Sequence, residues 1–104
     1  MVTSKKSRAI RLLEKASGGP LTLRGLLIAV REGEEWSQSE MAEKLKISRA
    51  NLCDIEKGRK NVAPARAAHF AGLLGYSEKQ FVQLALQDLV DEAGLSLHVD
   101  VHAT

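Results

Sequence analysis

Residues 37–58 read SQSEMAEKLKISRANLCDIEKG, a pattern that predicts two short helices joined by a tight turn. Ser37 and Glu40 have the spacing of a capping box, in which the serine hydroxyl and the glutamate carboxylate each accept a hydrogen bond from an unpaired backbone N–H at the start of a helix. Ser48 is a favourable N-cap for the second helix. Gly58 stands where a residue in the left-handed conformation would end that helix.

The apolar residues of this stretch recur at helical spacing, so each helix has one face suited to a hydrophobic core. In the first helix these residues are Met41, Ala42 and Leu45, and in the second they are Leu52 and Ile55. Burial of this face leaves the opposite side of the second helix turned outward.

The stretch resembles the helix-turn-helix of the Xre family of Cro- and lambda-repressor-like proteins. The family pattern is S-Q-x-x-[apolar]-A-x-x-L-x-[Ile/Val]-S-x-x-[Asn/Thr]-[Ile/Leu]-x-x-[Ile/Leu]-E-x-G. The positions that match in register are Ser37, Gln38, Met41, Ala42, Leu45, Ile47, Ser48, Asn51, Leu52, Ile55, Glu56 and Gly58. The resemblance extends from about Leu23 to Leu84, and it implies DNA binding.

Three further helical patterns accompany the two central ones. Thr22 can cap a helix with its apolar side chains at Leu23, Leu26, Leu27 and Val30. Pro64 fits the first turn of a later helix that Gly75 closes. Ser77 caps a last helix, which runs through Phe81, Leu84, Ala85 and Leu89 to about Glu92. We therefore predict an all-α, five-helix, lambda-repressor-like DNA-binding domain.

We expect three segments along the chain. Residues 1–19 form a basic N-terminal helix or arm, residues 20–93 form the helix-turn-helix domain, and residues 94–104 form a short C-terminal β-strand and dimerisation tail. The basic segment carries five of the seven Lys and Arg residues found in residues 1–31. It is either an arm that contacts the DNA backbone or minor groove, or a solubilising amphipathic helix.

The C-terminal strand is predicted from alternation, because Leu95, Leu97, Val99 and Val101 are separated by polar residues. A lone strand needs a partner to persist. The same strand of a second subunit, a strand of another protein and no strand at all (an unstructured tail) are the three alternatives.

Composition and charge narrow the classes of function. The 104 residues include 44% hydrophobic and 27% charged residues and one cysteine, Cys53, which suits a reducing compartment. No apolar run is long enough to span a bilayer, so we expect a cytoplasmic protein without membrane contact. Residues 44–66 carry seven Lys and Arg against two acidic residues, whereas residues 78–104 carry one Lys against five acidic residues. This asymmetry suggests a basic surface facing phosphates and an acidic end facing elsewhere.

No pattern of catalysis, of metal binding or of cofactor binding stands out. His98 and His102 lack the neighbouring ligands of a metal site, and Cys53 is expected to be inert rather than a redox switch. We find no glycine-rich phosphate loop and no nucleophile elbow. The prediction is therefore a protein that is not an enzyme and needs no cofactor or metal.

The second helix carries the residues predicted to read DNA bases. The family resemblance assigns base contact to Arg49, Ala50 and Asp54, and contact with a base or a phosphate to Asn51. An arginine can donate to guanine O6 and N7, an alanine can contact the thymine methyl group, and an aspartate can accept a hydrogen bond from cytosine N4.

A second set of residues is predicted to contact phosphates and position the helix. Gln38 begins the first helix, where the resemblance implies a phosphate contact that helps brace the second helix; its side-chain amide and the free backbone N–H groups suit an anion. Arg59 and Lys60 lie in the exposed basic loop that follows the second helix. The full predicted set is Gln38, Ser48, Lys57, Arg59 and Lys60.

Two residues depart from the family pattern. Lys46 replaces the glycine usual in the turn, and a left-handed conformation there would cost about 1 kcal/mol. Asp54 places an anion where many relatives carry a cationic or amide side chain, so it either imposes sequence specificity or weakens affinity.

We therefore expect a homodimeric, sequence-specific repressor of double-stranded DNA with a palindromic operator and half-sites about 34 Å apart or a multiple of that distance. The resemblance further implies a HigA-type antitoxin of a type II toxin–antitoxin module, which represses its own gene and binds a RelE-like toxin. The alternatives are a phage-type or general transcriptional regulator, and a toxin-inhibiting or other protein-interaction module with weak DNA binding.

Overall fold

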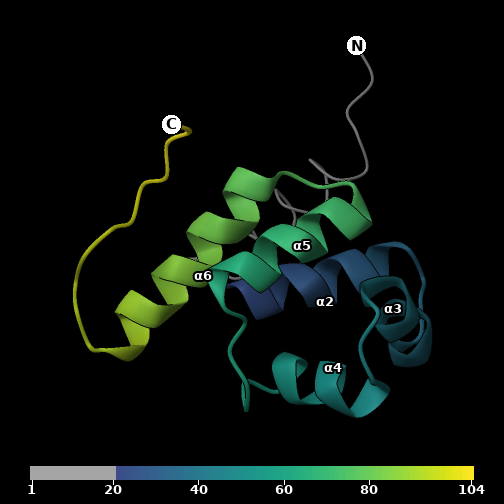
Figure 1. Ribbon diagram of the computed structural model, residues 1–104. Coiled ribbons are helices and arrows are strands. Elements are labelled where there is room, and N and C mark those ends of the chain that lie inside the picture. The colour runs from purple at the N-terminus through teal and green to yellow at the C-terminus, as the bar shows by residue number, and fades with distance from the viewer. Residues whose placement is uncertain (1–20) are drawn as a thin grey trace.

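The computed structural model describes residues 21–104, and this part of the chain forms five α-helices and no β-strand (Figure 1). The helices are α2 (Leu23–Gly33), α3 (Gln38–Leu45), α4 (Arg49–Glu56), α5 (Pro64–Leu74) and α6 (Glu78–Glu92). Each of the five helices predicted for the domain is present. The basic helix predicted within residues 1–19 lies outside the described residues.

The predicted caps set the helix boundaries. Glu40 N donates to Ser37 Oγ at 3.1 Å, and Ser37 N donates to Glu40 Oε1 at 2.9 Å, which completes the capping box of α3. The hydrogen bond from Ser37 N stabilises the ionised carboxylate and lowers the pKa of Glu40. Ser48 caps α4 by accepting a hydrogen bond from Asn51 N at 3.0 Å, and Gly58 follows α4 with a φ of 76°.

The turn between α3 and α4 requires a left-handed residue, and Lys46 supplies it with φ 58° and ψ 41°. This conformation lets Ile47 N donate to Ala42 O at 3.0 Å, which satisfies a carbonyl at the end of α3. A second left-handed residue, Glu35, has a φ of 58° in the turn between α2 and α3 and was not predicted.

The core consists of the apolar faces predicted for the helices, together with Val62 from the loop before α5. Burial is complete at the two phenylalanines, Phe70 on α5 and Phe81 on α6. Leu74 and Leu84 are only partly buried, and Leu89, which was expected on the inner face of α6, is 44% exposed. The buried residues are Leu23, Leu26, Leu27, Val30, Met41, Ala42, Leu45, Leu52, Ile55, Val62, Ala67, Phe70, Ala71, Phe81 and Ala85.

The packing leaves one side of α4 open. α5 and α6 lie side by side on one half of the molecule, while α4 lies at the opposite edge and packs on α2 and α3 (Figure 1). Within the described part of the chain, no helix covers the outer side of α4.

The C-terminal β-strand predicted within residues 94–104 is not formed, because residues 21–104 contain no second strand with which it could pair. Glutamine side chains of α6 hydrogen-bond to its backbone instead. Gln87 Nε2 donates to Leu97 O at 2.8 Å, and Gln87 Oε1 accepts from Val99 N at 2.8 Å. Gln83 Nε2 donates to Val99 O at 3.0 Å. The segment is therefore held along α6 by two side chains rather than by a sheet.

None of the helices in residues 21–104 combines the length and the apolar character that crossing a membrane would require.

Candidate nucleic-acid interface

The first turns of α4 carry all four residues that the sequence predicted as base readers. Arg49 and Ala50 are exposed, whereas Asn51 and Asp54 are half-buried. Within residues 21–104 the side chain of Arg49 makes no hydrogen bond or ion pair, so its guanidinium group is available to a ligand. The N-terminal end of an exposed helix is the part that recognition helices present to base edges in the major groove.

A polar network fixes α4 on the two preceding helices. Glu56 at the end of α4 accepts two hydrogen bonds from Arg31 of α2, from Nε at 2.8 Å and from Nη2 at 3.1 Å. Gln38 of α3 donates from Nε2 to the same carboxylate at 3.0 Å, and Arg31 Nη1 donates to Trp36 O at 3.3 Å. The side chain of Glu56 is only 6% exposed, and its hydrogen bonds with Arg31 raise the pKa of the guanidinium.

The network gives Gln38 a second task besides the predicted phosphate contact, because its amide nitrogen braces α4. Sequence reasoning missed the pairing of Arg31 with Glu56. The two residues are 25 positions apart, and neither has a local spacing that identifies its partner. The one available signal was the place of Glu56 in the matched motif, directly after the buried Ile55.

In the loop after α4, two residues predicted to contact phosphates lie against two residues predicted to read bases. Arg59 Nη1 lies 3.3 Å from Asp54 Oδ1, and Lys60 Nζ lies 3.7 Å from Asp54 Oδ2. Lys60 Nζ also donates to Asn51 Oδ1 at 3.4 Å. In this structure Asp54 therefore accepts a hydrogen bond from Arg59 and forms an ion pair with Lys60.

The remaining predicted phosphate contacts lie at helix ends. Ser48 is exposed, and its hydroxyl oxygen accepts the capping hydrogen bond of α4. Lys57 is exposed and directly follows α4. Gln38 begins α3 and is half-buried. Thus the described structure places the whole predicted set on α3, in the turn before α4 and in the loop after α4.

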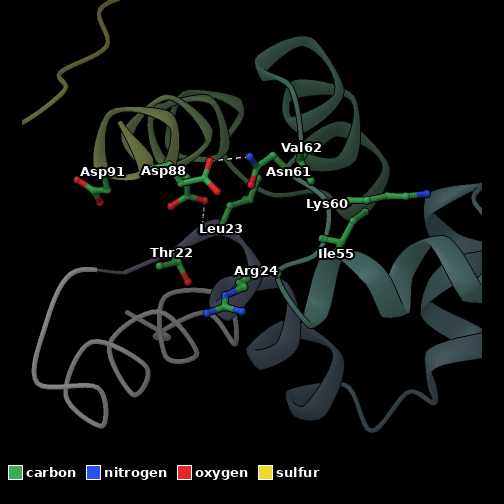
Figure 2. A pocket seen from close by; sticks show the side chains of 11 residues that line it. Thr22, Leu23, Arg24, Ile55, Lys60, Asn61, Val62, Asp88 and Asp91 are labelled. Carbon is green, nitrogen blue, oxygen red and sulfur yellow. Dashed lines mark hydrogen bonds between the residues drawn. The ribbon is translucent and has the colours of Figure 1, made fainter. Parts of the chain in front are cut away.

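A cavity of about 230 Å³ lies away from this surface, where α2, the loop after α4 and the last turns of α6 meet (Figure 2). Asp88 of α6 accepts a hydrogen bond from Leu23 N at 3.3 Å, and Asn61 donates to Glu92 at 2.6 Å. Burial raises the pKa of Asp88. Lys60 borders the cavity, but its side chain extends away from it in Figure 2.

The described residues contain no group of three or more His, Cys, Asp or Glu side chains that could hold a metal ion. Cys53 is half-buried on α4 and is not in a disulfide.

The fold and the exposed α4 define a helix-turn-helix protein. The family described as "Helix-turn-helix" matches residues 27–81, slightly more than half of the chain. The chain therefore belongs to this family, whose members bind DNA and regulate transcription. No curated protein and no solved structure matches the chain.

Proposed function

We propose that the protein is a homodimeric repressor that recognises a palindromic operator through α4. The observation that carries this proposal is the uncovered first turn of α4, where Arg49 and Ala50 are exposed beside the half-buried Asn51. The bracing of Glu56 by α2 and α3 supports it, since a reading helix must be held rigidly to discriminate between bases. The role is that of a cytoplasmic DNA-binding protein rather than an enzyme.

Binding to DNA upstream of the protein's own gene tests the proposal. Affinity for this DNA should exceed affinity for a scrambled duplex, and it should fall by about 10³- to 10⁵-fold between 50 and 200 mM salt if six to ten phosphates are contacted. Equal affinity for both duplexes would overturn sequence-specific repression at this site.

Arg49→Ala tests the assignment of base reading. This change should weaken operator binding by about 1–3 kcal/mol and relax the preference at one base pair. Lys57→Ala is the matched control, because loss of a phosphate contact weakens binding to all sequences similarly. A uniform loss in the Arg49 variant, measured by fluorescence anisotropy on operator variants, would remove its reading role.

The C-terminal segment is the proposed dimerisation element. The large apolar side chains exposed in the described residues are Leu89, Leu95 and Leu97, with exposed fractions of 44%, 51% and 62%, and all lie on α6 or the segment after it. Exposed apolar side chains that lie close together in the sequence, at the C-terminal end of the chain, favour contact with another protein surface. Deletion of residues 95–104 should shift the sedimentation mass from dimer toward monomer; an unchanged dimer would place the interface elsewhere.

The finer assignment, an autorepressing antitoxin that binds a RelE-like toxin, rests on the resemblance of the sequence to HigA-type antitoxins. The acidic end of the chain and its exposed leucines support a protein partner, because RelE-like toxins would have to bind outside α4 to leave DNA binding intact. A small RelE-like gene beside this one, with a product that co-purifies with the full chain, would support the assignment. The absence of such a gene would favour a phage-type or general regulator.

A further inference from the structure

The cationic side chains of the loop after α4 fold back onto the helix that is proposed to read DNA. Asp54 holds both Arg59 and Lys60, at 3.3 and 3.7 Å, and the Lys60 ammonium also donates to Asn51 Oδ1. The carboxylate of Asp54 and the amide oxygen of Asn51 are hydrogen-bond acceptors that base reading would require. In the free protein, both acceptors are therefore occupied by groups suited to phosphate.

The side chains can leave Asp54 without disturbing the loop backbone. Arg59 N and Lys60 N donate to the carbonyl oxygen of Asp54 at 2.8 and 3.3 Å, so the backbone is tied to α4 independently of the ion pairs. The Arg59 and Lys60 side chains are 63% and 55% exposed, compared with 29% for Asp54. Exposed ion pairs are weak, and a phosphate oxygen is a strong competing acceptor for either cation.

We propose that Asp54 is a specificity-determining residue that holds Arg59 and Lys60 in the free protein and releases them to the DNA backbone on binding. This inference rests on the proposed function. Any duplex must break the ion pairs to obtain the phosphate contacts. Only the operator then offers base donors to the uncovered acceptors of Asn51 and Asp54. Asp54 thus lowers affinity for nonspecific DNA more than affinity for the operator.

Asp54→Asn in the full chain tests the proposal. Its affinities for a scrambled duplex and for the operator are measured at one fixed salt concentration and compared with those of the wild type. Nonspecific binding should become about two- to thirty-fold tighter, as expected from the loss of two exposed ion pairs in the free protein. The ratio of operator affinity to nonspecific affinity should fall. Glu43→Gln is the matched control, since it removes one negative charge from an exposed position of α3 that contacts neither cation.

A double-mutant cycle separates competition for the cations from a general charge effect. Lys60→Gln should weaken nonspecific binding by at least about twofold more in the Asp54→Asn background than in the wild type. In the Asp54→Asn background the lysine binds a phosphate without first giving up an ion pair, so its loss removes more binding free energy. The same should hold for Arg59→Gln. When Lys60→Gln or Arg59→Gln is combined with Glu43→Gln, the effects of the two changes on the free energy of nonspecific binding should add. Circular dichroism melting curves establish that each variant is folded.

The outcomes are separable. Additive effects in the Asp54 cycles, or an Asp54→Asn gain no larger than that of Glu43→Gln, would overturn the inference while leaving DNA binding intact. Weaker binding of Asp54→Asn to both duplexes would also overturn it, since the aspartate would then be placing the cations for contact. If the wild type binds neither duplex, the proposed function fails first, and the inference fails with it.

Discussion

Lys46 shows how a single residue maintains the turn of this helix-turn-helix at a conformational cost. Its φ of 58° and ψ of 41° lie in the left-handed region, where a Cβ atom approaches the following carbonyl oxygen. The turn still forms because the hydrogen bond from Ile47 N to Ala42 O and the burial of Leu45 and Leu52 on either side hold it in place.

Lys46→Gly should stabilise the protein. Glycine removes the left-handed penalty but gains freedom in the unfolded chain, so the expected net rise in the free energy of unfolding is about 0.5–1 kcal/mol. Urea denaturation would measure it. Lys46→Ala retains a Cβ atom and serves as the control, with no comparable gain expected. An equal gain with alanine would attribute the effect to the lysine charge.

At the scale of elements, the network of Arg31, Glu56 and Gln38 joins α2, α3 and α4. The capping hydrogen bonds of the helix-turn-helix, by contrast, act within a single helix. The hydrogen bonds from Arg31 and Gln38 satisfy the nearly buried carboxylate of Glu56. A carboxylate satisfied in this way constrains the angle at which α4 leaves the core. The orientation of the proposed reading helix therefore depends on a residue of α2, a helix that carries none of the predicted DNA contacts.

Glu56→Ala should lower the free energy of unfolding by about 3 kcal/mol, because it leaves the largely buried guanidinium of Arg31 without the carboxylate that balances its charge. The double variant Arg31→Met with Glu56→Leu should be less destabilised than the sum of the two single changes, since it removes both charges together. Thermal and urea unfolding of the wild type, the two single variants Arg31→Met and Glu56→Leu, and the double variant would measure this coupling. A loss below about 1 kcal/mol in Glu56→Ala would show that the network contributes little.

The five helices could be predicted from the sequence because their signals are local. Ser37, Ser48 and Pro64 act within one turn of their helices, and the apolar faces repeat at a spacing that any core would bury. The left-handed Lys46 was likewise foreseeable from its place in the motif. Base-reading roles were transferred by resemblance, and they remain predictions.

The features that sequence reasoning missed depend on contacts between distant positions or on competition between partners. Gln87 lies 10 positions before Leu97, and nothing in the alternating pattern of the C-terminal segment indicates that a side-chain amide would take the place of a neighbouring strand. Asp54 could be recognised as unusual, but its ion pairs with Arg59 and Lys60 depend on the way the loop folds back.

At the scale of the whole molecule, Asp88 connects the two ends of the described domain. Its carboxylate on α6 accepts the hydrogen bond of Leu23 N at the start of α2, across 65 positions of sequence (Figure 2). Burial raises the pKa of Asp88, and the neighbouring carboxylates of Asp91 and Glu92 act in the same direction. The hydrogen bond from Leu23 and the charge of Arg24 oppose this rise without cancelling it.

The raised pKa predicts how stability depends on pH. Below the ordinary pKa of an aspartate, about 3.9, Asp88 is protonated in both states and adds no penalty. Between that value and the raised pKa the folded state binds more protons than the unfolded state, so stability falls as pH rises. Above the raised pKa the penalty is complete, and partial exposure of the site to solvent keeps it small.

Asp88→Asn should remove this dependence while retaining an oxygen that accepts from Leu23 N. The difference in unfolding free energy, variant minus wild type, should therefore increase from pH 4 to pH 7 in urea titrations. Glu43→Gln removes one negative charge from an exposed position of α3 and controls for net charge. A difference that decreases with pH would mean that the hydrogen bond from Leu23 outweighs burial, and that the ionised carboxylate stabilises the contact between α2 and α6.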